Sequence, residues 1–158
     1  MSILAKPTIA PPPRTPDVPK IAFFFAGILL VMAVAQLFTF DTFLTLLLSF
    51  NLPVSDAMTY FLGALLVVTE VFALPFLLRM PLSRAFRWVS MVCGWLVALI
   101  WVTITVWIAI TEPAVSSVGF LGTVADIMPG WWNVFISLSF VILAAWAAWG
   151  LWPGKRKK

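Results

Sequence analysis

A single acidic residue, Glu70, interrupts the apolar segment LLVVTEVFALPFLL at residues 65–78. A charged side chain near the centre of a bilayer costs roughly 3 kcal/mol or more, so an acid there turns inward to polar partners or stays protonated. Three functions use such a group: a proton relay, a hydrogen bond to a quinone head group, and a contact between subunits. The alternative is a structural hydrogen bond that fixes the register of the helices.

The side chains around Glu70 favour the structural alternative. Counting residues from the ends of the apolar segments places Ser139 and Trp95 at a similar depth, where the hydroxyl and the indole N–H can donate hydrogen bonds to the carboxylate. A proton relay needs successive titratable groups, but the chain has no histidine. We therefore expect Glu70, Trp95 and Ser139 to form a buried polar cluster. We predict no cofactor other than bound lipid, with quinone as the alternative ligand.

Metal binding and nucleophilic catalysis have little support in the sequence. The chain has no histidine, its one cysteine is Cys93, and its outer acids are dispersed singly, so no cluster of metal ligands is expected. No Ser or Thr has a histidine or an obvious lysine as its base. We expect Cys93, which lies inside a predicted span, to pack as a small apolar residue.

The composition predicts an integral membrane protein, because 63% of the 158 residues are hydrophobic and only 10% are charged. Irregular backbone cannot face lipid, so we expect an all-α bundle of four transmembrane helices. Four apolar segments are long enough to cross a bilayer, at residues 21–40, 57–78, 88–110 and 131–152. A shorter apolar segment, 43–50, is expected to form an interfacial or re-entrant helix. A proline-rich tail, 1–20, and a basic tail, 153–158, complete the chain.

The basic residues predict the orientation of the bundle. Lys and Arg occur before the first span, between the second and third spans, and after the fourth span. The connections after the first and third spans carry acids and no Lys or Arg. The positive-inside rule therefore places both termini and the middle connection in the cytoplasm. A nucleic-acid partner is not expected. The residues expected at the anionic membrane surface, or on a partner, are Arg79, Arg84 and Arg87 of the middle connection and Lys155, Arg156, Lys157 and Lys158 of the C-terminal tail.

The long apolar connection at residues 111–130 is a second candidate for contact with a partner. We expect it either to fold over the mouth of the bundle or to present a partner surface. The residues predicted for that surface are Phe120, Leu121, Ile127 and Met128. Among the small residues of the spans, we expect Gly27 and Gly94 to pack within the bundle, whereas the alanines of the last span are more open to an external partner.

Two segments resemble the DoxX/MauE family of small four-helix membrane proteins. TEVFALPFLLRMPLSR, residues 69–84, is similar to the family's second helix, which typically carries a Glu followed by small residues and ends in a Thr-Arg or Ser-Arg turn. LFTFDTFLTLLLSFNLP, residues 37–53, is similar to the family's short outer segment. The resemblance covers residues 21–110 well and the last span loosely.

The chain departs from this family in its outer loop. MauE-like members often carry a Cys-Gly-Cys-Phe-Gly motif before the last helix, where this chain has VGFLG at residues 118–122. Thiol–disulfide exchange within one chain needs a pair of thiols, so we do not expect the family's redox chemistry here.

These features predict a non-catalytic accessory or scaffold subunit of a larger bioenergetic or redox membrane complex, or a chain that associates with itself. We expect it in the inner (cytoplasmic) membrane of a bacterium. The family's link to quinone oxidoreductases implies an alternative, a quinone-binding subunit. A small transporter is a weaker alternative, because the chain shows no internal repeat and one intramembrane charge.

Overall fold

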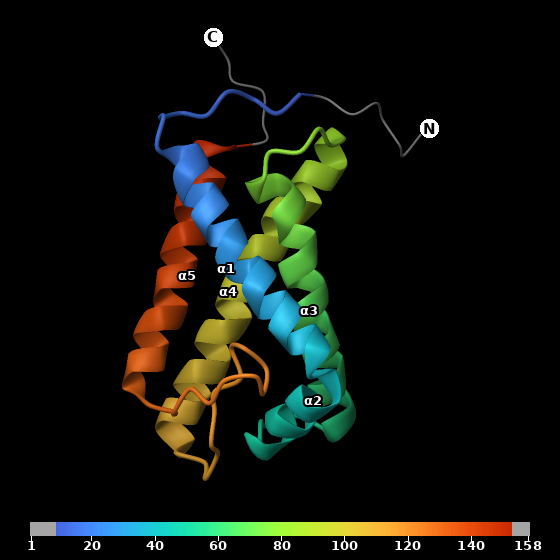
Figure 1. Ribbon diagram of the computed structural model, residues 1–158, viewed down its shortest axis with the longest axis vertical. Helices are drawn as coiled ribbons and strands as arrows, with labels where there is room; N and C mark the ends of the chain where they lie inside the picture. The colour runs from blue at the N-terminus through green and yellow to red at the C-terminus, as the bar shows by residue number, and fades with distance from the viewer. Residues whose placement is uncertain (1–8, 153–158) are drawn as a thin grey trace.

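The computed structural model describes residues 9–152, and five helices make up its architecture (Figure 1). Four of them are long and apolar enough to cross a membrane, which confirms the predicted all-helical chain with four potential spans. The helices are α1 (Val18–Phe38), α2 (Phe40–Ser49), α3 (Asp56–Leu77), α4 (Arg84–Thr111) and α5 (Trp131–Gly150).

Local capping explains where the long helices begin. Pro19 lies in the first turn of α1, where a missing N–H is no loss, so α1 begins at Val18 rather than at residue 21. Ser83 caps α4 by accepting a hydrogen bond from the N–H of Phe86 (3.3 Å), and this helix therefore starts at Arg84, four residues earlier than predicted. Ser55 caps α3 in the same way, because its hydroxyl accepts a hydrogen bond from the N–H of Met58 (3.3 Å).

The four long helices pack side by side around one apolar core. Helix α1 contacts α3 and α5, and α4 completes the bundle between them. The short helix α2 lies across the end of α3, where Gly63 allows close contact with Leu44 and Leu47 (Figure 1). The indole N–H of Trp107 in α4 donates to the carbonyl of Phe50 at the end of α2 (3.1 Å), which ties α2 to a second long helix.

The start of α1, the end of α5 and the α3–α4 connection lie at the same end of the bundle (Figure 1). The proline-rich segment before α1 runs along this end. The N–H of Arg14 donates to the carbonyl of Gly150 (3.1 Å), and its guanidinium lies 4.9 Å from the ring centre of Trp149. Val18 packs directly on Gly150, where a Cβ atom would contact it. The described part of the predicted tail is therefore packed on the bundle.

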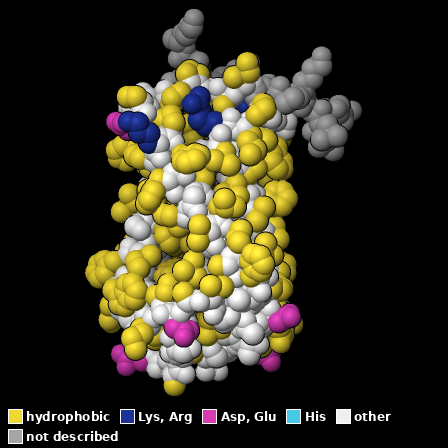
Figure 2. Space-filling model, viewed as in Figure 1, with side chains coloured by type: hydrophobic (Ala, Val, Ile, Leu, Met, Phe, Trp, Pro, Cys, Tyr) yellow, Lys and Arg dark blue, Asp and Glu magenta, His cyan; other side chains and the backbone are white. Residues whose placement is uncertain are grey.

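The surface carries an apolar belt between two charged ends. Figure 2 shows hydrophobic side chains over the middle of the bundle, Lys and Arg near the end that carries the termini, and most of the Asp and Glu side chains at the opposite end. Asp17, which pairs with Lys20 (3.3 Å), is an acid of the first end. We call these two ends the basic end and the acidic end.

The two glycines predicted to pack within the bundle differ in their surroundings. Gly94 is buried, as predicted, and a Cβ placed on it would lie 3.7 Å from the Cβ of Ala73 in α3. In contrast, no atom of residues 9–152 outside α1 lies within 4 Å of a Cβ placed on Gly27. The packing role predicted for Gly27 is therefore wrong, because this residue faces outward. Of the α5 alanines, Ala144, Ala147 and Ala148 are buried.

Candidate functional site: a buried carboxyl group that joins three helices

Glu70 of α3 is completely buried, and it is bonded to two other helices. Its Oε1 atom accepts hydrogen bonds from the indole Nε1–H of Trp101 in α4 (3.1 Å) and from the amide Nε2–H of Gln36 in α1 (3.2 Å). Both donors are themselves 0% exposed. A hydrogen bond that lacks competing water fixes the relative position of its two groups, so this cluster sets the register of α1, α3 and α4.

The connection between α4 and α5, at residues 111–130, completes this cluster; we call it the outer connection, after the side of the membrane predicted for it from the sequence. The same Nε2 group of Gln36 donates to the carbonyl of Phe120 (3.0 Å). The Phe120 ring is buried against Trp101, with ring centres 4.6 Å apart, and against Phe140 of α5, with centres 5.7 Å apart. The connection at residues 111–130 therefore folds into the mouth of the bundle, which is one of the two arrangements expected from the sequence.

Glycine and serine residues give this connection its path. Gly119 (φ 85°) and Gly122 (φ 57°) adopt left-handed backbone conformations, which residues with a Cβ rarely occupy. The hydroxyl of Ser117 accepts from the N–H groups of Gly119 and Ile127, both at 3.2 Å, and so closes the loop on itself. These bonds hold Phe120 at the turn that enters the bundle.

Two oxygen atoms of the cluster have no hydrogen-bond partner among residues 9–152: Glu70 Oε2 and Gln36 Oε1. A buried polar atom without a partner is costly, and a water molecule or a ligand hydroxyl is the usual way to satisfy it. One turn further along α4, at its interface with α5, the hydroxyls of Thr105 and Ser137 lie 2.7 Å apart. Thr105 also donates to the carbonyl of Trp101 (2.8 Å). The polar groups thus extend from Glu70 to α5.

The partners predicted for Glu70 were wrong. Ser139 is exposed and its hydroxyl donates to the carbonyl of Ile136 in its own helix, whereas the buried serine of α5 is Ser137. Trp95 is half-buried, and the donor to Glu70 is Trp101. Six residues turn an α-helix by about 240°, so Trp95 and Trp101 face different neighbours. Counting depth from the helix ends did not specify which face of each helix turns inward.

Gln36 was not identified from the sequence, although it carried a signal. It is the only glutamine in the chain, and it lies within an otherwise apolar span. An amide in such a position needs partners for the same reason as a carboxyl group does.

The basic residues predicted for a membrane surface divide into three groups. Arg84 is exposed, and Arg79 is half-buried at a left-handed turn (φ 57°). The prediction that Arg87 lies at the membrane surface is wrong, because this residue is only 5% exposed. Its guanidinium donates to the carbonyl of Leu82 (3.3 Å) and so stabilises the α3–α4 connection. The remaining four, Lys155, Arg156, Lys157 and Lys158, lie outside the described residues.

The predicted partner surface of the outer connection is smaller than expected. Phe120 is 4% exposed and belongs to the core, which corrects its assignment to a surface. Leu121 and Ile127 are half-buried, and Met128 is the one predicted member that is strongly exposed (75%).

Comparison with known proteins identifies no relative: no family model, no curated protein and no solved structure matches this chain.

Proposed function

We propose that this chain is a non-catalytic, DoxX-like subunit that packs through the outward face of α1 into a larger membrane assembly. The observation that carries the proposal is a shallow apolar groove of about 600 Å³ on α1, lined by Phe23, Phe24, Gly27 and Val31 among others. Gly27 is one of its lining residues, and the position of a Cβ on this glycine is open space. A small residue at such a position lets a second membrane helix approach the backbone closely.

The Glu70 cluster supports a structural role for the interior polar groups. Glu70 Oε1 accepts from donors of two other helices, and one of those donors also binds the outer connection. These bonds link segments of the chain itself, so the carboxyl group stabilises the subunit that presents the groove.

The segregation of charge supports an orientation. Two basic residues of the basic end are Lys20, at the start of α1, and Arg84, at the start of α4. The acids of the acidic end lie near the starts of α2 and α3 or in the α4–α5 connection: Asp41, Asp56, Glu112 and Asp126. By the positive-inside rule, the basic end and both termini face the cytoplasm of a bacterial cell.

Filling the groove tests the proposal. Gly27→Leu adds a side chain into open space on α1, so the bundle should fold while a partner helix is excluded. Val92→Leu, at a 47% exposed position on α4, is the matched control. After purification from native membranes in a mild detergent, native mass spectrometry should find a partner or a second copy on the wild type and on Val92→Leu, but not on Gly27→Leu. A wild-type chain that is always recovered alone would contradict the proposal.

A quinone-binding subunit is the second candidate, and one observation favours it. Glu70 Oε2 is buried without a partner in the described part of the chain. As a carboxylate oxygen it can accept a hydrogen bond from the hydroxyl of a quinol, and as part of a protonated carboxyl group it can donate one to the carbonyl of a quinone. This candidate predicts saturable quinone binding by the wild type that Glu70→Gln weakens. Failure of the wild type to bind quinone would eliminate it.

A further inference from the structure

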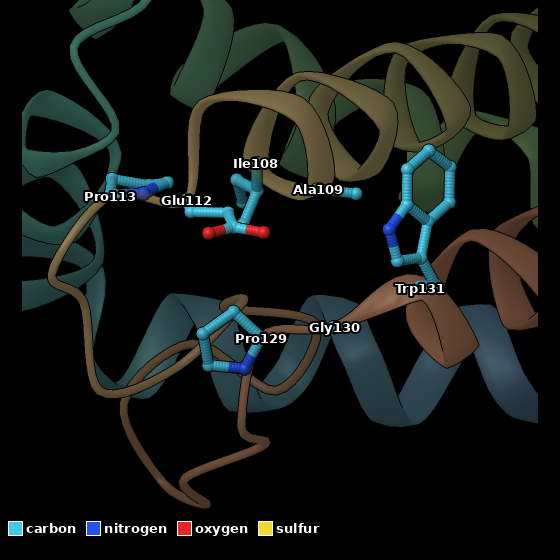
Figure 3. Close-up of a pocket in the computed structure, with 7 residues that line it drawn as sticks. All are labelled: Ile108, Ala109, Glu112, Pro113, Pro129, Gly130 and Trp131. Atoms are coloured by element: carbon cyan, nitrogen blue, oxygen red, sulfur yellow. The ribbon is translucent and has the colours of Figure 1, made fainter.

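A cavity of about 260 Å³ opens at the acidic end of the bundle, between the end of α4 and the start of α5 (Figure 3). Its volume is slightly below the range of roughly 300 Å³ upward that is typical of drug-sized sites. The cavity therefore suits a small ligand or the head group of a lipid. This cavity shares no lining residue with the groove on α1, and none of the residues of the Glu70 cluster lines it.

The carboxylate of Glu112 points into this cavity from the end of α4 (Figure 3). Glu112 follows the last residue of α4 in a left-handed conformation (φ 44°), and its N–H donates to the carbonyl of Ile108 (2.9 Å). The carboxylate thus adds its charge to the negative end of the helix dipole. Within residues 9–152 the structure contains one ion pair, between Lys20 and Asp17, so Glu112 is not neutralised by a basic side chain there.

The other walls of the cavity provide apolar surface and the indole N–H of Trp131 as a side-chain hydrogen-bond donor. Ile108 and Ala109 of α4 line one side, and Pro129 faces them from the outer connection (Figure 3). Trp131, the first residue of α5, stands across from Glu112 with its indole nitrogen on the side of the cavity (Figure 3). Tryptophan at the end of a membrane helix lies at the depth of lipid head groups, where its N–H donates to polar groups.

We propose that this cavity binds an alkylammonium group joined by a short linker to an oxygen acceptor. The ammonium lies on the Glu112 carboxylate, the acceptor oxygen takes the Nε1–H of Trp131, and the carbon linker contacts Ile108 and Ala109. Two sources carry this chemistry: the head group of phosphatidylethanolamine and a free amino alcohol such as ethanolamine. The carboxylate and the absence of a nearby basic residue in the described structure select against an anionic head group.

The full chain in detergent or nanodiscs allows a direct test. Native mass spectrometry should show that the wild type retains phosphatidylethanolamine in preference to phosphatidylglycerol, and a free ethanolamine titration should show whether the soluble amine also raises the melting temperature. Retention of the lipid alone identifies a head-group site, whereas saturable binding of ethanolamine without lipid identifies a site for the free amine.

Three variants assign the binding to the cavity. Glu112→Gln should weaken binding roughly tenfold or more, because a hydrogen bond to a charged group is lost. Trp131→Phe keeps an aromatic ring but removes the N–H donor, and should weaken it less. Asp126→Asn removes an exposed acid outside the cavity and should bind as the wild type does.

Two results would overturn the proposal: equal retention of both lipids by a wild type that also fails to bind ethanolamine, or unchanged binding by Glu112→Gln. If Glu112→Gln is not recovered folded, the lipid comparison on the wild type and the Trp131→Phe variant decide the question.

Discussion

The hydroxyl of Ser90 in α4 lies between two backbone groups of α3. It accepts from the N–H of Phe76 (3.0 Å) and donates to the carbonyl of Phe72 (2.6 Å), the two groups that would bond each other in a regular helix. Pro75 explains this arrangement, since its ring has no N–H and opens the helix at this turn. A side chain of one helix therefore repairs the backbone of its neighbour.

Ser90→Ala tests this repair at the residue scale. The variant removes the inserted hydroxyl from an apolar interface, and we expect the free energy of unfolding to fall by about 1 kcal/mol. Ser139→Ala, at an exposed serine of α5, should leave stability unchanged. The double variant Pro75→Ala/Ser90→Ala should lose less than the sum of the two single losses, because α3 can then form its own bond. Strictly additive losses would contradict an inserted hydroxyl.

The sequence was sufficient to identify Glu70 but not the residues that contact it. A lone acid in an apolar span must be satisfied, so its importance follows from its own type and position. Glu70 bonds Trp101 rather than Trp95. The buried serine of α5 is Ser137, which bonds Thr105 and not Glu70, rather than Ser139. Both outcomes depend on the rotation of each helix about its axis. That rotation is set by the packing of all four helices together, which no local pattern specifies.

At the scale of elements, the outer connection acts as a plug whose position depends on contacts far apart in the chain. Gln36 bonds Phe120, and Thr39 Oγ1 accepts from the N–H of Thr123 (3.2 Å), and in each case the partners are 84 positions apart in the sequence. A Cβ placed on Gly122 would contact Thr39 Oγ1 and would lie 3.2 Å from the carbonyl oxygen of Ala35. The plug therefore fits α1 only because Gly122 has no side chain.

Gly122→Ala should displace this plug. The added methyl group is excluded both by α1 and by the left-handed backbone, so we expect the Gln36–Phe120 bond to be lost and stability to fall by roughly 1–3 kcal/mol. Hydrogen exchange measured by mass spectrometry should speed up at residues 117–127. Gly27→Ala is the matched control, since its methyl group enters open space and should be tolerated. Equal effects of the two substitutions would refute the plug.

Hydropathy predicted the four long helices. The four long helices lie where the apolar segments are, although α1 and α4 begin three and four residues before the predicted spans. A short helix, α2, occupies Phe40–Ser49, and its interfacial or re-entrant position stays a prediction. The path of the outer connection could not be predicted, because its apolar residues suit a plug and an exposed surface equally. Only the contacts of Phe120 with Trp101 and Phe140 distinguish the two.

At the scale of the whole molecule, the separation of charge along the bundle predicts its orientation. Single cysteines placed on an otherwise cysteine-free chain, made by Cys93→Ser, report this orientation. Arg84→Cys marks the basic end, and Asp126→Cys marks the acidic end; both positions are exposed. In intact bacterial cells, a thiol reagent that cannot cross the inner membrane should label Asp126→Cys and spare Arg84→Cys. The reverse pattern would contradict the orientation.

The most direct test of the account is the free energy of unfolding of two Glu70 variants in a lipid bilayer. Glu70→Gln keeps an acceptor oxygen for Trp101 and Gln36, so its stability should lie within about 1 kcal/mol of the wild type. Glu70→Leu leaves the Trp101 N–H buried without an acceptor and should lose roughly 1–3 kcal/mol. Asp126→Asn controls for the removal of an acid. A Leu variant as stable as the wild type would contradict the claim that this carboxyl oxygen joins the helices.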